Sequence, residues 1–148
     1  PGALPPLIGW FAAGGPNSAA AWSLFGILFA WQIPHFMAIS WLYREDYERG
    51  GFRMLSIVEP TGQAVARRAF AWSFVLLGAA LAPTLVGFAS WVYFAGAVLL
   101  TVPFIALAWQ FLRASEDAMR KASRRLFLAS IFHLPSIFFL LAADRLIF

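Results

Sequence analysis

The sequence has no cysteine, and no Asp, Glu, Lys or Arg precedes Arg44. The absence of cysteine excludes disulfides and thiolate metal ligands, and it leaves the redox compartment undetermined. Charged residues make up only 12% of the 148 residues, whereas 61% are hydrophobic, and the mean hydropathy is +0.75. So few polar side chains cannot cover a water-soluble globule of this size. The composition therefore excludes a soluble domain and indicates an integral membrane protein.

Almost all charged residues that do occur gather in two segments, residues 44–68 and 113–125. Because these segments separate long apolar runs, we expect both of them to be loops. The isoelectric point near 10.4 is also typical of nucleic-acid-binding proteins, but the basic residues here flank apolar runs instead of forming one open face. We therefore expect a lipid bilayer, and no nucleic acid, as a partner.

Four uncharged stretches are long enough to cross a membrane, since about 18 apolar residues span the hydrocarbon core as a helix. These stretches are residues 18–43, 69–89, 91–112 and 126–143. Residues 2–13 are too short for a complete span, so we expect a partial span there, followed by a turn and by Ser18 as the N-cap of the next helix. The sequence thus predicts an all-α polytopic membrane protein, with four complete spans and one partial span in a single helical region over residues 1–148.

The distribution of basic residues predicts the orientation of the chain. The segments 44–68 and 113–125 hold five Lys or Arg residues each, whereas the connections near residues 14–17 and 89–91 hold none. Since basic loops stay on the cytoplasmic side, we expect both charged segments to face the cytoplasm. The chain begins at Pro1 without an initiator methionine or a recognisable signal peptide, so we expect it to be the C-terminal part of a longer protein.

An ionisable residue lies inside the first complete span, in "WQIPHF" at residues 31–36, and a charged run, "YREDYERGGFRML" at residues 43–55, follows it. Intramembrane ionisable residues are costly and are often functional. On one continuous helix, His35 and Asp46 would share a face about 16 Å apart along the axis. We therefore expect a line of polar groups from an imidazole at membrane depth to a carboxylate at the cytoplasmic mouth.

Structural interpretations compete with these functional ones. His35 could instead bond a backbone carbonyl that Pro34 frees from the helix ladder. The charged run could be a solvated helix end, in which Glu45 and Arg49 stand at a favourable spacing. We interpret His133, in "FHLPS", as structural.

Three segments in this order, "GALPPLIGW", "WQIPHF" and "YREDYERGGFRML", resemble the haem O synthase (protohaem farnesyltransferase) branch of the UbiA-type intramembrane prenyltransferases. The match in order and spacing covers residues 2–55, and the later spans agree in topology only. The resemblance implies that the chain is part of a UbiA-type transmembrane helix bundle in a bacterial inner membrane. It also implies two protein partners, the N-terminal helices of the same protein and haem A synthase.

The implied reaction transfers a farnesyl group from farnesyl diphosphate to a vinyl group of haem b, which gives haem O. In such enzymes Mg²⁺ binds the diphosphate and neutralises its charge. The diphosphate can then leave in a site of low dielectric constant. The resemblance implies that Asp46 is catalytic and contacts Mg²⁺ through the diphosphate, with Glu45 as a weaker candidate.

The resemblance also implies residues that bind the two substrates. Guanidinium groups suit bidentate binding of diphosphate or of haem propionates. The arginines with this implied role are Arg44, Arg49 and Arg53. Apolar rings at Trp31, Phe36 and Phe29 suit an isoprenoid or a porphyrin, although they could equally face lipid or a neighbouring helix. His35 would ligate haem iron or bond a propionate.

The chain departs from the family pattern in two places. The first metal-binding motif, of N-x-x-x-D-x-x-x-D type, is absent, because Asn17 is the only asparagine and no aspartate follows it at four or eight residues. The second motif has Leu42 and Gly50 at the positions four residues either side of Asp46. We therefore expect the chain alone to be inactive.

Two other functions fit the same pattern. One is a UbiA-type prenyltransferase that acts on a quinone-precursor ring, although the segment "WQIPHF" favours haem. The other is a non-catalytic membrane bundle, such as a transporter subunit or an assembly protein. Mg²⁺-dependent binding of a prenyl diphosphate separates both enzymes from the non-catalytic bundle.

Overall fold

The computed structural model describes residues 2–59 and 61–147, and within them every regular element is a helix. The helices are α1 (Pro5–Ala12), α2 (Ala19–Leu42), α3 (Arg44–Arg49), α4 (Leu55–Val58), α5 (Gln63–Leu85), α6 (Trp91–Arg113) and α7 (Glu116–Ile147). By length and composition, α2, α5, α6 and α7 are able to cross a membrane. This confirms the predicted all-α class of an integral, polytopic membrane protein.

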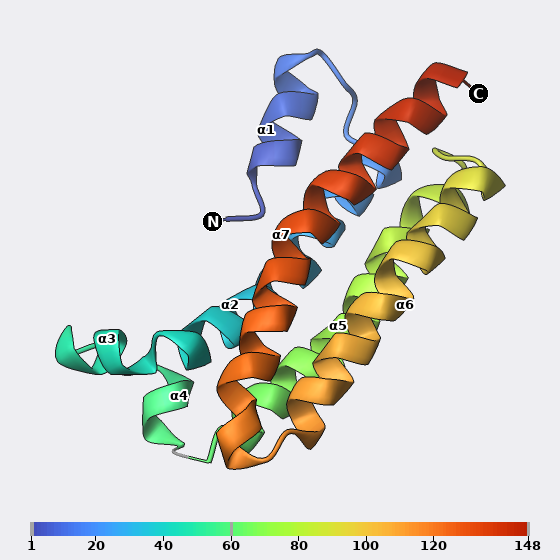
Figure 1. The fold of residues 1–148 in the computed structure, drawn as a ribbon. Helices are drawn as coiled ribbons and strands as arrows, with labels where there is room; N and C mark the ends of the chain where they lie inside the picture. The colour runs from blue at the N-terminus through green and yellow to red at the C-terminus, as the bar shows by residue number, and fades with distance from the viewer. Residues whose placement is uncertain (1, 60, 148) are drawn as a thin grey trace.

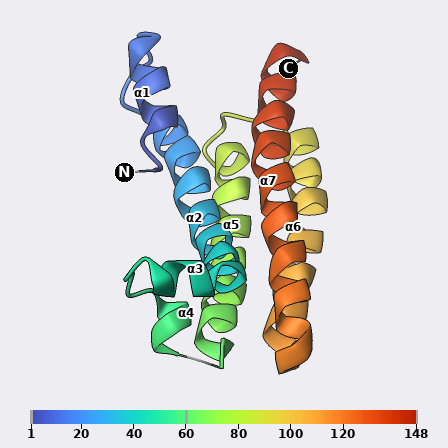
Figure 2. The same ribbon diagram turned by 60° about the vertical axis from the view of Figure 1, so that its left-hand side comes forward.

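The four long helices pack as a ring in which each contacts two of the others. Helix α5 packs against α2 and α6, and α7 packs against α6 and returns to α2 (Figure 1). Figure 2 shows these helices side by side, with the short α1 lying along α2. The α5–α6 connection lies at one end of the bundle, and α3, α4 and the α6–α7 connection lie at the other. The two charged segments therefore share one end.

The first turn of the chain places α1 against α2. Helix α1 ends just before Gly14, whose φ of 76° is a left-handed conformation that glycine adopts without strain. The indole Nε1 of Trp10 then donates a hydrogen bond to the carbonyl oxygen of Pro16 at 2.8 Å. Ser18 caps α2 as predicted, since its hydroxyl accepts a hydrogen bond from the backbone N–H of Ala21 at 3.4 Å.

Small residues let the long helices approach closely. Several alanines are almost completely buried: Ala30, Ala38, Ala66, Ala69, Ala80, Ala97 and Ala108. A Cβ atom on Gly96 of α6 would lie 2.6 Å from Cδ2 of Leu140 on α7, so this glycine lets the Leu140 side chain pack directly on α6. Such close contact matters in lipid, because lipid is as apolar as the side chains and burial alone drives association only weakly.

The predicted loops over residues 44–68 and 113–125 are wrong over much of their length, because these segments contain helix. Helix α5 begins at Gln63 and α7 begins at Glu116, both well before the expected spans at 69 and 126. In α7, buried positions recur every three or four residues straight through the charged part: Met119, Ser123, Leu126, Ser130, His133, Ile137, Leu141 and Asp144. This stripe packs on the neighbouring helices, while Lys and Arg, which are good helix formers, point outward.

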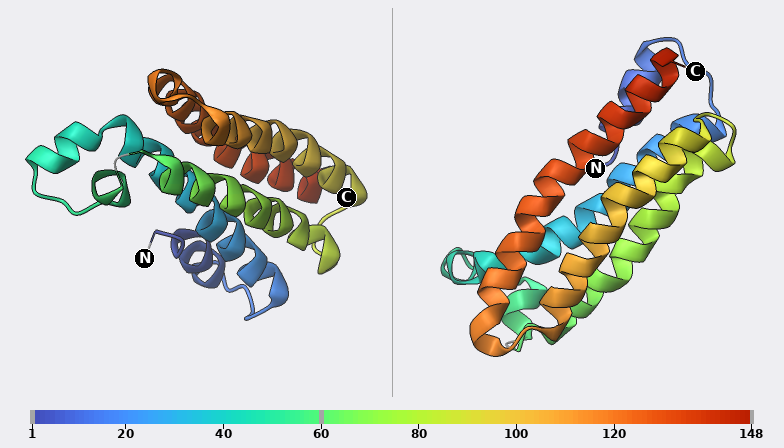
Figure 3. Two further views of the ribbon diagram at one scale, coloured as in Figure 1. Left: turned by 90° about the horizontal axis from the view of Figure 1, so that it is seen from below. Right: turned by 45° about the vertical axis from the view of Figure 1, so that its right-hand side comes forward.

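The expected continuous helix from His35 to Asp46 is also wrong. Helix α2 ends at Leu42, and Tyr43 has a non-helical conformation with φ −112° and ψ 27°. The chain then turns out of the bundle, so that α3 projects beyond its side (Figure 3). Charged residues leave the apolar bundle here because their side chains need water. His35 and Asp46 therefore do not share one helix face.

Glu59 closes the connection that leads into α5. Its carboxylate accepts hydrogen bonds from the hydroxyl of Thr61, from the backbone N–H of Thr61 at 3.1 Å and from the backbone N–H of Ala64 at 3.0 Å. These hydrogen bonds, that of the Thr61 hydroxyl first and then that of Ala64, hold the pKa of Glu59 below its usual range. Glu59 thus satisfies a free donor in the first turn of α5.

A second carboxylate fixes α7 at the opposite end of the bundle. Asp144, which is buried, accepts hydrogen bonds from the backbone N–H of Ser90 at 2.9 Å and from the Ser90 hydroxyl. Ser90 in turn caps α6, where its hydroxyl accepts from the N–H groups of Val92 and Tyr93 at 3.1 and 3.3 Å. This network ties the end of α7 to the start of α6 and helps to set the register of α7 in the bundle.

Candidate functional site

A cluster of side chains around the single histidine His35, the histidine cluster, lies between α2 and α7, within the membrane-spanning part of both helices. The Nδ1 atom of His35 lies 2.7 Å from Oγ of Ser130, and Nε1 of Trp31 donates to the Ser130 carbonyl oxygen at 2.8 Å. The ring of His35 stacks on Trp31, with centroids 4.5 Å apart and planes 21° apart. The ring of Phe127 lies 5.2 Å from His35, centroid to centroid. The imidazole is therefore held by both helices.

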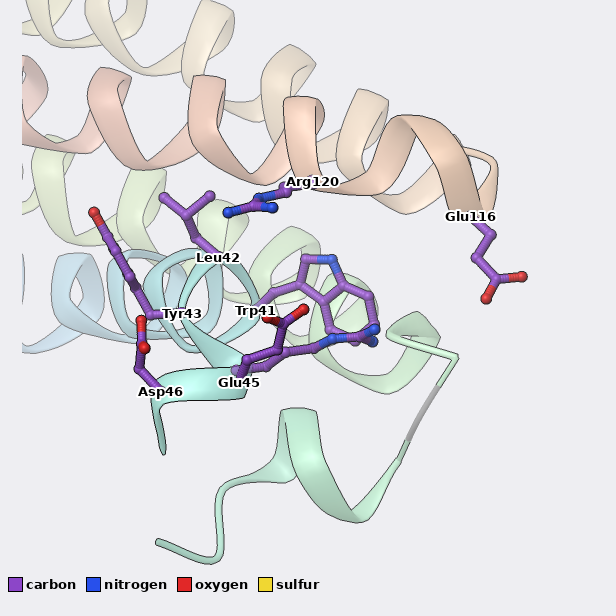
Figure 4. A pocket seen from close by; sticks show the side chains of 8 residues that line it. Trp41, Leu42, Tyr43, Glu45, Asp46, Glu116 and Arg120 are labelled. Atoms are coloured by element: carbon purple, nitrogen blue, oxygen red, sulfur yellow. The ribbon is translucent and has the colours of Figure 1, made fainter. Parts of the chain in front are cut away.

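A pocket opens at the charged end of the bundle, between the α2–α3 junction and the first turns of α7 (Figure 4). Its lining residues are Trp41, Leu42, Tyr43, Arg44, Glu45, Asp46, Glu116 and Arg120. In Figure 4, Arg120 reaches from α7 toward Leu42 and Trp41, whereas Glu116 points away from them. This mouth pocket combines carboxylates with guanidinium groups, which suits a ligand that carries negative charge and is accompanied by a cation.

A second hollow beside the mouth pocket is more basic. It is lined by Leu42, Tyr43, Asp117, Arg120, Lys121 and Arg124. Arg120 lines both hollows, so its guanidinium group is available to either. Three cationic side chains face a single carboxylate here, and such a surface attracts anions.

Exposed contacts hold the charged side chains of α3. Asp46 forms an ion pair with Arg49, and both side chains are exposed. An exposed pair of this kind is worth only about 0–1 kcal/mol, so Asp46 can exchange Arg49 for another partner at little cost. Arg44 takes a different position, with its guanidinium carbon 4.6 Å from the centroid of the Trp41 ring. Trp41 itself is buried and forms part of the pocket wall.

The described residues do not form a divalent cation site by themselves. Within residues 2–59 and 61–147, no three His, Cys, Asp or Glu side chains gather closely enough to hold a metal ion. Asp46 is exposed and already paired with Arg49. It can therefore supply one hard oxygen ligand only if further ligands come from a bound substrate or from another part of the protein.

The predicted site residues fall into two groups. At membrane depth lie Trp31, His35 and Phe36, with the rings of His35 and Phe36 5.6 Å apart at their centroids. At the mouth pocket lie Arg44, Glu45 and Asp46.

Three other residues that the sequence singled out lie apart from these groups. Arg49 touches the mouth pocket only through Asp46. Arg53 is exposed between α3 and α4 and lines neither hollow. Phe29 packs on α5, 5.9 Å from Trp72 at the ring centroids.

The residues that α7 contributes to both groups were not predicted from the sequence. Ser130 and Phe127 complete the histidine cluster, and Arg120 and Glu116 complete the mouth pocket. A usable signal was present, since the buried stripe of α7 keeps its three-to-four spacing through the charged residues. That spacing extends the helix to the mouth pocket, although it does not reveal which residues of α2 lie opposite.

His133 belongs to neither group. Its Nε2 atom lies 3.0 Å from Oγ1 of Thr101, and its ring packs against Phe104, 5.1 Å away at the centroids. Both partners are on α6, so these contacts join α6 to α7.

The chain matches the model of the UbiA prenyltransferase family over residues 1–131. It is 42% identical over 146 residues to "Protoheme IX farnesyltransferase" of Opitutus terrae, covering 98% of this chain and 48% of that protein. It is 42% identical over 154 residues to the protein of the same name from Koribacter versatilis, with 99% and 49% covered. "Protoheme IX farnesyltransferase, mitochondrial" of Homo sapiens is 40% identical over 142 residues, with 95% and 30% covered.

The chain thus spans about half the length of these two bacterial relatives. No solved structure matches it. The family model covers α1, both groups of site residues and the first half of α7. The chain therefore belongs to the UbiA prenyltransferase family.

Proposed function

We propose that the full-length protein transfers a farnesyl group from farnesyl diphosphate to a vinyl group of haem b and so makes haem O. The allylic C–O bond breaks, diphosphate leaves, a C–C bond forms to the vinyl carbon, and water supplies the hydroxyl group. Relatives named protoheme IX farnesyltransferase support this proposal along the whole chain. The observation that carries it is the presence of a charged mouth pocket and an intramembrane histidine cluster in one bundle.

The mouth pocket would bind the diphosphate of the donor. Arg44 and Arg120 offer guanidinium groups from two different helices, and such groups bind phosphate oxygens with two parallel hydrogen bonds. We propose Mg²⁺ as the divalent ion, with Asp46 and, less directly, Glu45 among its carboxylate neighbours. Bound Mg²⁺ would neutralise the leaving group. The remaining ligands would come from the diphosphate and from the N-terminal helices of the same protein.

The histidine cluster would bind the acceptor. His35 presents an imidazole among the aromatic rings of Trp31, Phe36 and Phe127, an environment suited to a flat, apolar porphyrin. A quinone-precursor ring has no metal for an imidazole to bind, which is why haem is the better acceptor here. Arg49 and Arg53 lie outside the mouth pocket and are exposed, so we assign them to haem propionates or to the surface.

The same charged end supports a proposed orientation. We propose that α3, α4 and the α6–α7 connection face the cytoplasm of a bacterium, with the protein in the inner membrane. Haem A synthase, which would take over the product, is the proposed downstream partner.

The direct test is a transfer assay with the purified full-length protein in lipid nanodiscs. With Mg²⁺, farnesyl diphosphate and haem b, mass spectrometry should detect haem that has gained farnesyl and hydroxyl groups. Product from a quinone-precursor ring instead of haem would move the protein to the other prenyltransferase class. Failure of the full-length protein to bind farnesyl diphosphate in the presence of Mg²⁺ would identify a non-catalytic bundle. The 148-residue chain alone should give no product.

A further inference from the structure

The hydroxyl group of Ser130 lies between two partners. Its Oγ atom is 2.6 Å from the carbonyl oxygen of Phe127, one turn earlier on α7, and 2.7 Å from Nδ1 of His35 on α2. A serine hydroxyl has one hydrogen to donate and lone pairs with which to accept. The Phe127 carbonyl can only accept, so it takes the single hydrogen.

The proton on the imidazole follows from this assignment. Since the Ser130 hydrogen points to Phe127, the Ser130 oxygen accepts, and Nδ1 of His35 must donate to it. In the neutral ring only one nitrogen carries hydrogen, so Nε2 of His35 then holds a free lone pair. No described residue forms a hydrogen bond with Nε2, and His35 is only partly buried. The lone pair is thus available to a ligand.

The same residue also fixes the orientation of the ring. The Ser130 carbonyl accepts from Nε1 of Trp31, and the Trp31 indole stacks on the imidazole at 4.5 Å. Ser130 therefore holds His35 directly through its hydroxyl and indirectly through Trp31. Phe127, on the preceding turn, lies against the ring at 5.2 Å. The imidazole has little freedom to turn its Nδ1 and Nε2 edges over.

We propose that Ser130 is a positioning residue for the acceptor, which holds His35 with Nδ1 protonated so that Nε2 ligates the iron of haem b. The proposal rests on the proposed function. It decides between the two roles open to His35, because a haem propionate offers only acceptor oxygens and a lone pair on Nε2 has no hydrogen for them. Histidines that bind metals commonly donate their other N–H to a fixed partner, and here that partner is a hydroxyl.

The first test compares haem binding by three variants of the full-length protein in nanodiscs. Ser130→Ala should weaken haem b binding about 10- to 100-fold and change the iron–imidazole absorption bands, the usual cost of losing the partner of a ligating histidine. Ser130→Thr keeps the hydroxyl and should restore both readouts. Ser123→Ala is the matched control, since Ser123 is equally buried on α7 and its hydroxyl is also bonded to the carbonyl three residues earlier, at 2.9 Å. It should bind haem like the wild type.

The second test reads the tautomer without haem and in the unchanged protein. Nitrogen NMR of ¹⁵N-histidine-labelled protein, with the His35 signals assigned by their loss in His35→Ala, should show a protonated Nδ1 and an unprotonated Nε2. A protonated Nε2 in the neutral wild-type ring would overturn the proposal. Haem binding and transfer by Ser130→Ala that equal those of Ser123→Ala would overturn it as well, while leaving the proposed function intact. A wild-type protein that neither binds nor modifies haem b would instead refute the proposed function, and the role of Ser130 with it.

Discussion

Arg120 on α7 and Asp46 on α3 line one pocket at the charged end of the bundle. The two residues come from the two charged segments of the sequence, and the return of α7 to α2 brings these segments together. The pocket thus combines a guanidinium group from one segment with a carboxylate from the other. This relationship makes α7 part of the proposed donor site, which the motifs of the first 55 residues did not indicate.

Arg120→Gln should weaken binding of farnesyl diphosphate to the full-length protein. A hydrogen bond to a charged group is worth about 1.5–3 kcal/mol, which corresponds to roughly a tenfold or greater rise in the dissociation constant. Arg125→Gln is the matched control, since Arg125 is exposed on the same helix and lines neither hollow. Titration with a non-hydrolysable prenyl diphosphate measures both. Equal affinities of the two variants for the prenyl diphosphate would show that Arg120 is not part of the donor site.

The proposed orientation predicts the accessibility of single cysteines. Val58→Cys and Ser115→Cys replace exposed residues at the charged end, and Ala13→Cys replaces an exposed residue at the opposite end. In full-length protein with any other cysteine replaced by serine, a membrane-impermeant maleimide applied to intact cells should label only Ala13→Cys. Labelling of Ser115→Cys from outside would mean that the orientation is the reverse of the proposed one.

Gly62 should tolerate a side chain much less well than Gly87. Both have positive φ, at 71° and 74°, so alanine costs about 1–2 kcal/mol of backbone strain at either position. A Cβ atom on Gly62 would also lie 2.4 Å from Sδ of Met119 and 2.8 Å from ring carbons of Trp41, whereas one on Gly87 meets nothing within 4 Å. Gly62→Ala should therefore cost about 1–3 kcal/mol more. Thermal unfolding in one detergent compares them, and equal losses would show that the turn at Gly62 relaxes freely.

Glu59 should contribute stability that disappears in acid. Its pKa is lowered from 4.5 by the hydrogen bonds of Thr61 and Ala64, so its contribution is present above pH 4.5 and is lost as the pH falls through the lower folded value. Glu59→Gln should reduce the acid dependence of the unfolding temperature. Glu48→Gln, at an exposed position on α3, is the control and should leave it unchanged. Identical pH profiles for Glu59→Gln and the wild type would mean that the carboxylate does not cap α5 in solution.

Composition and hydropathy were sufficient to predict the long helices, because every uncharged run of adequate length must satisfy its backbone internally in lipid. The ends of these helices were harder to predict. A charged segment predicts a loop, yet Arg120 and Arg124 continue α7. They do so because Met119, Ser123 and Leu126 form one buried stripe on the other side of the helix. The break at Tyr43 had no signal of its own, as neither glycine nor proline marks it.

The candidate site was predicted in part. His35, Trp31 and Asp46 are types of residue that carry chemistry, and the resemblance implies roles for them. Their partners could not be predicted, because Ser130 is 95 residues from His35 and only the packing of α7 on α2 brings them together. A serine in an apolar helix has no distinguishing pattern in sequence. Its bond to the preceding turn is common, and only the imidazole opposite gives it a proposed function.

The central claim is that the acceptor binds at membrane depth near His35 and the donor diphosphate binds at the mouth near Asp46. Titration of His35→Ala and Asp46→Asn, each in the full-length protein, with haem b and with a non-hydrolysable prenyl diphosphate in Mg²⁺ tests it most directly. We predict that His35→Ala weakens only haem binding and that Asp46→Asn weakens only diphosphate binding, since a group alters the binding of ligands that it contacts. Glu45→Gln should have a smaller effect on the diphosphate than Asp46→Asn. Unchanged haem binding and turnover in His35→Ala, or equal loss of both ligands in either variant, would contradict the division of the site.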